Sequence, residues 1–392
     1  MLKFAVLSIS FVLASGGAIS GILPEIQRVL EINQMQADLL LTTPNIAVLI
    51  ATLYSNVLVS KIGMKKIVLL GLAITGLAGM APVFIEGFHA LIISRFILGL
   101  GLGIYNSFAI SYISFLFDKR EIPTLMGFRV SWEFAGMSLL TVLSGFLLRF
   151  GWHISFLLYG AAFIALAIFY KIVPDVDLKT LVDSSEANLV NKKKMPVLVY
   201  CSLAFMLITI ICAAAIGIRF PSLMAEVHGQ GHNSSNVMAA QPIVNILAAL
   251  SFGRMHRRFG RKILYSGLLA LIASLLIIGF SNGNYQMLVV GFFLHGLVPG
   301  WVIPFAFQTI ARITSGKTQN LAMSLMVVVI NTAIFSVPFV IGFIEKILDA
   351  QTLSAAYPLL ALIMLAVLST VILLGKRIAN WSSNPQLAQD ID

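Results

Sequence analysis

Charged residues are scarce in this chain. Asp, Glu, Lys and Arg make up 11% of its 392 residues, whereas hydrophobic residues make up 59% and the mean hydropathy is +0.96. Soluble domains carry about 25% charged residues, so the composition excludes an ordinary soluble domain and predicts an all-α integral membrane protein. The net charge of +10 does not indicate nucleic-acid binding, because the basic residues lie in short loops between apolar runs.

The chain also lacks the residues of several common sites. Its two cysteines, Cys201 and Cys212, lie in one apolar run, which argues against a disulfide framework. We expect no metal and no cofactor, because the sequence contains no CxxC pair and no His-rich motif. A Gly-x-x-x-x-Gly-Lys loop for ATP is also absent from the sequence, so any active transport must be driven by an ion gradient.

Long apolar runs organise the whole sequence. A helix needs about 20 apolar residues to cross the roughly 30 Å of hydrocarbon in a bilayer, and twelve runs meet this requirement. They cover approximately 4–24, 37–60, 67–85, 90–117, 122–148, 153–172, 196–220, 236–254, 263–281, 286–311, 319–344 and 353–375. The sequence therefore predicts a bundle over 1–172, a cytoplasmic linker over 173–195, a second bundle over 196–375 and a cytoplasmic tail over 376–392.

The basic residues predict the orientation of the chain in the cell membrane. Most of the 26 Lys and Arg residues fall in alternate loops on one side, which is also the side of both termini. The opposite side receives Arg28, Arg149, Arg219 and Lys346. Because loops rich in Lys and Arg stay in the cytoplasm, we expect both termini to be cytoplasmic.

An internal repeat with an offset of 197 residues relates the two halves. Equivalent positions carry the same residue in three pairs: Pro24 and Pro221, Gly99 and Gly296, and Gly103 and Gly300. Repeats of this kind are common in secondary transporters. The shared offset predicts two pseudo-symmetric bundles of six helices each.

Two basic loops share the same offset and carry a family signature. The segment Gly253–Lys262 (GRMHRRFGRK) and its weaker copy Asn56–Lys65 (NVLVSKIGMK) each lie between two apolar runs. They resemble the loop Gly-x-x-x-Asp-Arg-x-Gly-Arg-Lys of the major facilitator superfamily, with Arg257 and Ser60 where Asp is expected. The resemblance implies the twelve-helix fold of that family and a gate at these loops. The gating residues are expected to be Ser60, Lys61, Gly63, Lys65, Gly253, Arg257, Arg258, Gly260, Arg261 and Lys262.

Two further motifs extend the resemblance. Arg95-Phe96-Ile97-Leu98-Gly99-Leu100-Gly101 matches the family pattern Arg-x-x-x-Gly-x-Gly of the fourth helix. In the fifth helix, Gly136 and Gly145 match a glycine motif of proton-driven exporters, followed by Gly151-Trp152 at the turn. Leu140-Thr141 replaces the Gly-Pro pair of that motif. The resemblance is therefore to drug or metabolite:proton antiporters, and export is favoured over uptake.

Four ionisable residues inside predicted spans are candidates for proton coupling. Arg129 and Glu133 are one helical turn apart on the fifth helix, and Arg95 lies in the fourth. Charges at this depth are costly, so they usually face the interior of the bundle or water. We expect Glu133 to bind the proton, with Arg129 and Arg95 as partners, and His295 as a relay. The alternatives are a local Arg129–Glu133 ion pair and a hydrogen-bonded structural histidine.

Polar and aromatic side chains within the spans predict a substrate cavity near the middle of the membrane. Such residues either converge on a cavity or hold neighbouring helices together. The candidates are Asn45, Tyr105, Asn106, Trp132, Gln241, Asn245, Trp301, Gln308 and Asn331.

These observations predict a secondary transporter rather than an enzyme. We expect a monomer in the lipid bilayer that moves a small organic substrate together with protons by alternating access. One alternative is a proton symporter that imports an organic anion through Arg95 and Arg129. Alternatives from other classes are a transporter-like membrane sensor and a membrane enzyme that modifies lipids.

Overall fold

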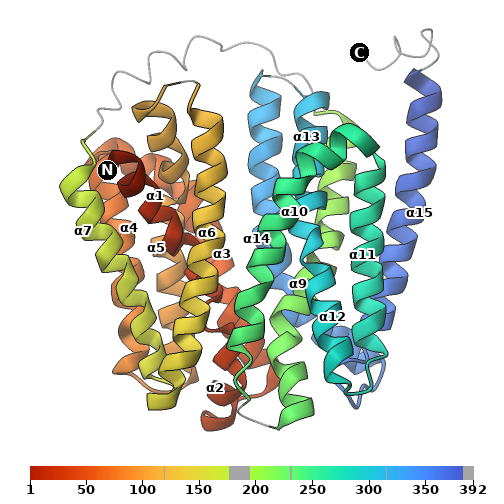
Figure 1. Cartoon of the computed structure of the whole chain (residues 1–392), viewed down its shortest axis with the longest axis horizontal. Coiled ribbons are helices and arrows are strands. Elements are labelled where there is room, and N and C mark those ends of the chain that lie inside the picture. The colour runs from red at the N-terminus through yellow and green to blue at the C-terminus, as the bar shows by residue number, and fades with distance from the viewer. Residues whose placement is uncertain (119, 176–194, 230–231, 315, 383–392) are drawn as a thin grey trace.

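The computed structural model describes residues 1–118, 120–175, 195–229, 232–314 and 316–382, and these residues form an all-helical protein. Figure 1 shows two groups of helices side by side, one from each half of the sequence. The elements of the first half are α1 (Leu2–Leu13), η1 (Ala14–Gly17), η2 (Ser20–Ile22), α2 (Leu23–Val29), α3 (Gln34–Ile62), α4 (Met64–Met80), η3 (Ala81–Val83), α5 (Phe88–Leu116), α6 (Ile122–Leu147), η4 (Leu148–Phe150), η5 (Ile154–Gly160) and α7 (Ala161–Ile172). Those of the second half are α9 (Val197–His228), α10 (Ser235–Phe259), α11 (Lys262–Gly279), α12 (Tyr285–His295), α13 (Leu297–Ile313), α14 (Gly316–Ile347) and α15 (Tyr357–Ser382).

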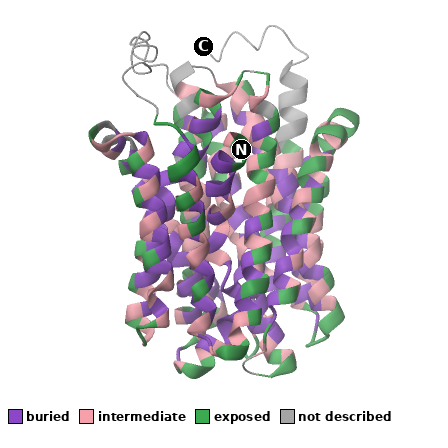
Figure 2. Cartoon of the chain, turned by 60° about the vertical axis from the view of Figure 1, so that its left-hand side comes forward, coloured by how far each residue is buried: buried purple, intermediate pink, exposed green. Residues whose placement is uncertain are grey.

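The described helices confirm the expected all-α membrane fold. Eleven of them are long and apolar enough to cross a membrane, and a shorter apolar helix, Tyr357–Leu373, lies where the twelfth span was predicted. Many large apolar side chains on the outer faces are exposed, as expected for helices in contact with lipid (Figure 2). Helix α15 continues to Ser382, beyond the predicted end at 375, and nearly all of the predicted linker lies outside the described residues.

The structure corrects the placement of Arg219. The sequence placed it at the end of a span at 196–220, on the side opposite to the termini. Helix α9 instead continues to His228, so Arg219 lies well inside the helix and its side chain is 1% exposed. The helix extends this far because apolar residues such as Phe220, Leu223 and Met224 follow Arg219 and pack in the core.

Close helix packing confirms the internal repeat. A Cβ atom on Gly103 of α5 would collide with Val48 and Ala51 of α3, and a Cβ atom on Gly300 of α13 would collide with Ala248 and Ala249 of α10. Ala51 and Ala248 are themselves 197 positions apart. The same relation holds for Gly99 beside Ala47 and for Gly296 beside Val244. Each half therefore uses equivalent glycines to join equivalent helices.

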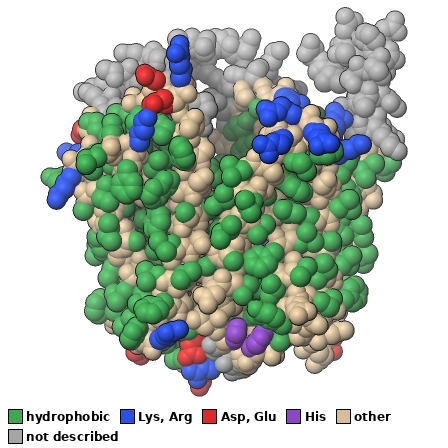
Figure 3. Space-filling model, viewed as in Figure 1, with side chains coloured by type: hydrophobic (Ala, Val, Ile, Leu, Met, Phe, Trp, Pro, Cys, Tyr) green, Lys and Arg blue, Asp and Glu red, His purple; other side chains and the backbone are tan. Residues whose placement is uncertain are grey.

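The most extensive contacts between the two halves are those of α3 with α14 and of α6 with α10, while α2 and α3 also contact α9 and η2 contacts α9 and α10. Both described ends of the chain lie at one end of the molecule, which we call the terminal end, and α2 lies at the other, which we call the distal end (Figure 1). Hydrogen bonds join the halves near the distal end, where Ser234 N donates to Gly21 O (3.1 Å), Asn233 Nδ2 to Gly145 O (2.9 Å) and Ser138 Oγ to Ala239 O (2.6 Å). At the terminal end, Figure 3 shows a recess between the halves, with Lys and Arg side chains beside it.

Replacing Gly300 with Ala should destabilise the second half. The added methyl group meets the backbone of Ala249 at 2.7 Å, and overpacking of this kind costs about 1–3 kcal/mol. The matched control is Gly342→Ala on α14, where nothing lies within 4 Å of the new atom. Thermal unfolding in detergent should show a lower midpoint for Gly300→Ala and an unchanged or higher one for Gly342→Ala. Equal midpoints for the two variants would contradict the packing role of Gly300.

Candidate functional site

Three residues predicted from the sequence meet between α5 and α6. Arg129 and Glu133 form an ion pair across one turn of α6, with 3.5 Å between Arg129 Nη1 and Glu133 Oε2. Arg129 Nη2 also donates to Asn106 Oδ1 on α5 at 3.2 Å. The Glu133 side chain is 33% exposed and that of Arg129 13% exposed. The carboxylate is thus held by a cation and is only partly buried.

Arg95 does not join this group, which corrects its expected pairing with Glu133. It precedes Asn106 by eleven residues on α5, or about 16 Å along the axis at 1.5 Å per residue. Its side chain is completely buried against the rings of Phe156 and Tyr159, with its guanidinium carbon 4.9 and 4.8 Å from the ring centres. Arg95 Nη1 donates to the Tyr159 hydroxyl (2.6 Å), which in turn donates to Ser15 O (2.9 Å). In this position Arg95 ties α5 to η5 and η1.

His295 and a pair of amide side chains lie near the same helix break in the second half. It is the last residue of α12, and its Nδ1 is 3.1 Å from Phe292 O in the same helix. On α10, Gln241 and Asn245 exchange side-chain hydrogen bonds of 3.2 and 3.3 Å. A Cβ atom on Gly296, the residue after His295, would lie 3.2 Å from Asn245 Oδ1. The break between α12 and α13 therefore lies against this amide pair.

Several other candidates for the cavity have local roles in the structure. Tyr105 is fully buried and packs against Gly71 of α4. The Trp301 indole nitrogen on α13 donates to Ala248 O (3.1 Å) and to Ser251 Oγ (3.0 Å) on α10. The amides of Asn45 and Asn331 donate to backbone oxygens of their own helices, at 3.3 and 2.9 Å, and Gln308 is half-buried on α13.

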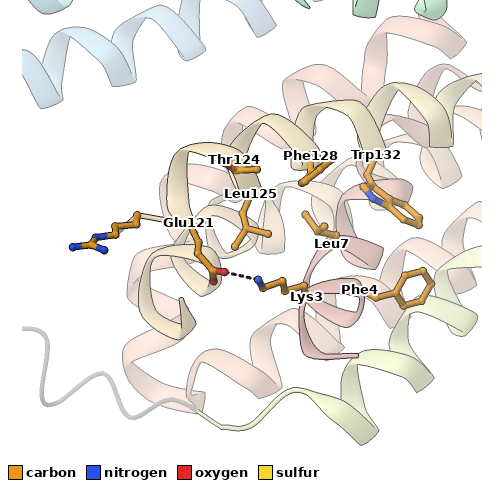
Figure 4. A pocket seen from close by; sticks show the side chains of 9 residues that line it. Lys3, Phe4, Leu7, Glu121, Thr124, Leu125, Phe128 and Trp132 are labelled. Atoms are coloured by element: carbon orange, nitrogen blue, oxygen red, sulfur yellow. Dashed lines mark hydrogen bonds and ion pairs between the residues drawn. The ribbon is translucent and has the colours of Figure 1, made fainter. Parts of the chain in front are cut away.

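Trp132 lines a pocket between α1 and α6 near the terminal end. Its ring packs edge-on against Phe4 and Phe11, with centroids 5.3 and 6.1 Å apart. The pocket has a volume of about 440 Å³, and Lys3 Nζ is 2.6 Å from Glu121 Oε1 beside it (Figure 4). The aromatic side chain predicted to line the substrate cavity thus contacts the first helix.

The two basic loops end equivalent helices in equivalent ways. Gly63 after α3 has φ 85° and Gly260 after α10 has φ 54°, conformations that favour glycine. The side chains of Lys61, Arg257, Arg258, Arg261 and Lys262 are exposed, Lys65 Nζ lies 5.5 Å from the Tyr170 ring centre, Gly253 has open space around it, and the side chain of Ser60 lies outside the described residues.

The sequence analysis missed an ion triad that connects three helices near the distal end. Arg219 on α9 donates through Nε to Asp38 Oδ2 on α3. Its Nη1 and Nη2 donate to Glu345 Oε1 and Oε2 on α14 at 2.8 and 3.3 Å. The signal available in the sequence was the presence of charged residues at the ends of predicted spans. Asp38 lies at the start of one span, Arg219 at the end of another, and Glu345 just after a third. The predicted topology places all three on the same side of the membrane.

The fold and the paired halves define a multi-pass, all-helical membrane protein. A family model described as Major Facilitator Superfamily matches residues 5–233 and 201–388. The chain belongs to this superfamily, as the sequence predicted.

Known relatives and solved structures agree with this assignment. The chain is similar to the "Multidrug resistance protein 1" of Bacillus subtilis (strain 168), with 30% identity over 147 residues; the match spans 37% of this chain and 38% of that protein. The fold is similar to the nucleoside transporter NupG, with a TM-score of 0.73, 13% identity and coverage of 94% of this chain and 97% of that one. A D-xylose-proton symporter gives a TM-score of 0.70 and 13% identity over 93% of this chain and 95% of its own. These structural likenesses show the fold alone.

Replacing Arg95 with Lys should destabilise the first half. An ammonium group lacks the planar surface that packs against two rings, and hydrogen bonds to charged groups contribute about 1.5–3 kcal/mol. Arg149→Lys is the matched control, because Arg149 is exposed and lies over the single ring of Phe146. We expect a lower unfolding temperature for Arg95→Lys and no change for the control. An unchanged temperature for both would show that the stacked guanidinium is not structural.

Proposed function

We propose that the protein is a proton-coupled secondary transporter that exports a small organic compound by alternating access. The observation that carries this proposal is the unequal contact between the halves, which are hydrogen-bonded at the distal end and separated by a recess at the terminal end. A single path that is closed at one end and open at the other is one of the two states such a transporter needs. Similarity to a multidrug resistance protein supports export.

Alternation requires that the distal contacts break while the halves remain intact. The residues at the closest of these contacts are small. Gly21 of η2 and Gly145 of α6 have no side chains, which leaves room for Ser235 at the start of α10. The bonds that join the halves here are mostly single hydrogen bonds to backbone oxygens. Each such bond contributes about 0.5–1.5 kcal/mol net, so a modest difference in binding free energy can shift the balance between the two states.

Within this transporter, Glu133 is the proposed proton site. Protonation removes its charge, and Arg129 then keeps its bond to Asn106 on α5 while losing its ion-pair partner on α6. Proton binding would thereby change how α5 and α6 are connected. The exposed third of the Glu133 side chain supports this role, because a sealed ion pair could not exchange protons during transport.

A second candidate is a proton symporter that imports an organic anion. It is favoured by Arg129 Nε, which is buried and, among the described residues, has no hydrogen-bond partner. An unfilled guanidinium donor is a suitable contact for a carboxylate or phosphate of a substrate. Arg95 Nε and Nη2 are also buried without a hydrogen-bond partner among the described residues, but Arg95 is completely buried within the first half, so it is a weaker candidate for this contact than Arg129.

Replacing Glu133 with Gln should abolish proton-driven transport while substrate binding persists. The amide keeps the shape of the side chain but cannot take up a proton at physiological pH. Proteoliposomes loaded with the purified variant should lose the dependence of flux on a pH gradient, whereas counterflow at equal pH on the two sides should continue. Glu86→Gln, on an exposed distal residue, is the control and should transport normally. Full gradient dependence in the Glu133→Gln protein would contradict the assignment.

Transport assays in vesicles of known orientation determine the direction of transport. We expect both termini to be cytoplasmic and the chain to work as a monomer in the cytoplasmic membrane, so inverted vesicles with an acidic lumen should accumulate an exported fluorescent compound. Accumulation only in right-side-out vesicles with an acidic exterior would favour the importing symporter. Stabilisation of the protein by compounds that it never moves would favour a sensor, and release of a modified lipid would favour an enzyme.

A further inference from the structure

Among the described residues, the two halves are connected by an ion pair that belongs to the triad of Asp38, Arg219 and Glu345. Asp38 belongs to the first half, and Arg219 and Glu345 belong to the second. The side chains of Asp38 and Arg219 are 0% and 1% exposed, while that of Glu345 is 21% exposed. One guanidinium therefore holds two carboxylates, one on each side of the boundary, and of the three side chains only that of Glu345 is partly exposed.

The triad has more negative charge than positive charge. With both carboxylates ionised, its net charge is −1. The groups around it are neutral: Gln34 and Ser222 are amide and hydroxyl, and the hydroxyl of Tyr357, which faces the triad from α15, donates to Ala215 O at 3.3 Å. Lys346, the next residue after Glu345, is exposed. In the part of the chain that is described, no second Lys or Arg is paired with either carboxylate.

A polar cavity of about 740 Å³ leads to the triad from the distal end. Gln27, Glu31 and Gln34 line it from the first half, and Ser222 and Glu226 from the second. The Gln34 side-chain nitrogen donates both to Asp38 Oδ1 (2.8 Å) and to Ser222 Oγ (2.9 Å), so it forms the inner wall between the cavity and the triad.

The charges of this cavity favour cations. Arg28, its cationic residue, is already paired with Glu25 at 2.6 Å. The remaining ionisable lining residues, Glu31 and Glu226, are acids. An anionic cavity concentrates cations, including protons.

We propose that the triad binds one proton and that this proton holds the distal end closed. A buried net charge is strongly unfavourable, and one proton on either carboxylate cancels it. A metal cation fits less well, because it needs several free oxygen ligands. Here Asp38 Oδ1, Asp38 Oδ2 and both oxygens of Glu345 already accept hydrogen bonds.

The direction of the pH effect follows from the two states. In the closed state the carboxylates share one cation in a dry site, whereas opening would admit water to both and let both ionise. The closed state therefore binds the proton more tightly, and lowering the pH favours closure. One coupled proton changes the ratio of closed to open molecules by at most about tenfold per pH unit. Because the carboxylates interact, the proton belongs to the pair rather than to one residue.

The test measures the distance across the distal end without any substrate. Spin labels at Val29→Cys and Gln351→Cys, in a chain with Cys201 and Cys212 replaced by Ser, report on exposed positions of the first and second half. Pulsed spin-resonance distances in lipid nanodiscs should show one short distance at pH 5 and a growing population of longer distances as the pH rises to 9.

Two variants make the charge argument specific. Glu345→Gln removes the surplus charge and keeps the Asp38–Arg219 pair, so its distal end should stay closed at every pH. Arg219→Gln leaves two carboxylates without their cation, so its distal end should be open at neutral pH. Glu86→Gln removes a distal carboxylate that faces His153 outside the triad, and it should respond to pH as the unmodified chain does.

Three results would overturn the proposal: distances that do not change with pH, a full pH response in Glu345→Gln, or a response to Na⁺ in place of choline at constant pH, which would indicate a metal cation. Each differs from a failure of the proposed transport function, because the distance is measured without flux and its outcome is independent of the transported compound.

Discussion

The guanidinium of Arg219 is the group on which the observed arrangement of the halves depends. It lies on the second half and forms ion pairs with Asp38 of the first half and Glu345 of its own. Removing one partner of a buried pair leaves an uncompensated charge, which typically costs 3–5 kcal/mol. The other described contacts across the distal boundary are weaker hydrogen bonds between neutral groups. The Arg219 ion pairs are thus the described contacts at this end whose loss by substitution would cost the most.

The charged residues within the helices of the first half have two separate roles. Arg95 packs against the rings of Phe156 and Tyr159 and donates a hydrogen bond to Tyr159, and it joins elements of its own bundle. Arg129 and Glu133 lie on the α6 side with part of the carboxylate exposed. In the proposed transport cycle, separating the two kinds of residue would let Glu133 change charge without loosening the helix packing.

Much of the fold could be predicted because its causes are local in sequence. Apolar runs of bilayer length determine the spans, and Gly103 and Gly300 reveal the repeat through a shared offset. The Arg129–Glu133 pair was predictable for the same reason, since residues one turn apart on a helix are neighbours. Asn106, which completes that group from α5, was predicted only as one of many cavity candidates.

The distal triad depends on contacts that no local pattern contains. Asp38, Arg219 and Glu345 come from three helices far apart in the sequence, and each looks like an ordinary charge at the end of a span. Arg95 shows the opposite case: its motif was recognised, but its partners Phe156 and Tyr159 lie more than 60 residues away in the sequence. In both cases the contacts depend on how side chains from helices distant in the sequence pack together.

The glycine contacts that join α3 to α5 and α10 to α13 have a mechanical consequence. Helices that touch backbone to backbone slide little against each other, so each half acts as a stiff lever. Helix α3 has 29 residues and is about 43 Å long at 1.5 Å per residue. A tilt of roughly 10° about the distal contact would move its far end by about 7 Å over that length. In the proposed transport cycle, these close glycine contacts would let a minor rearrangement around a few polar side chains produce a larger movement at the other end of the helix.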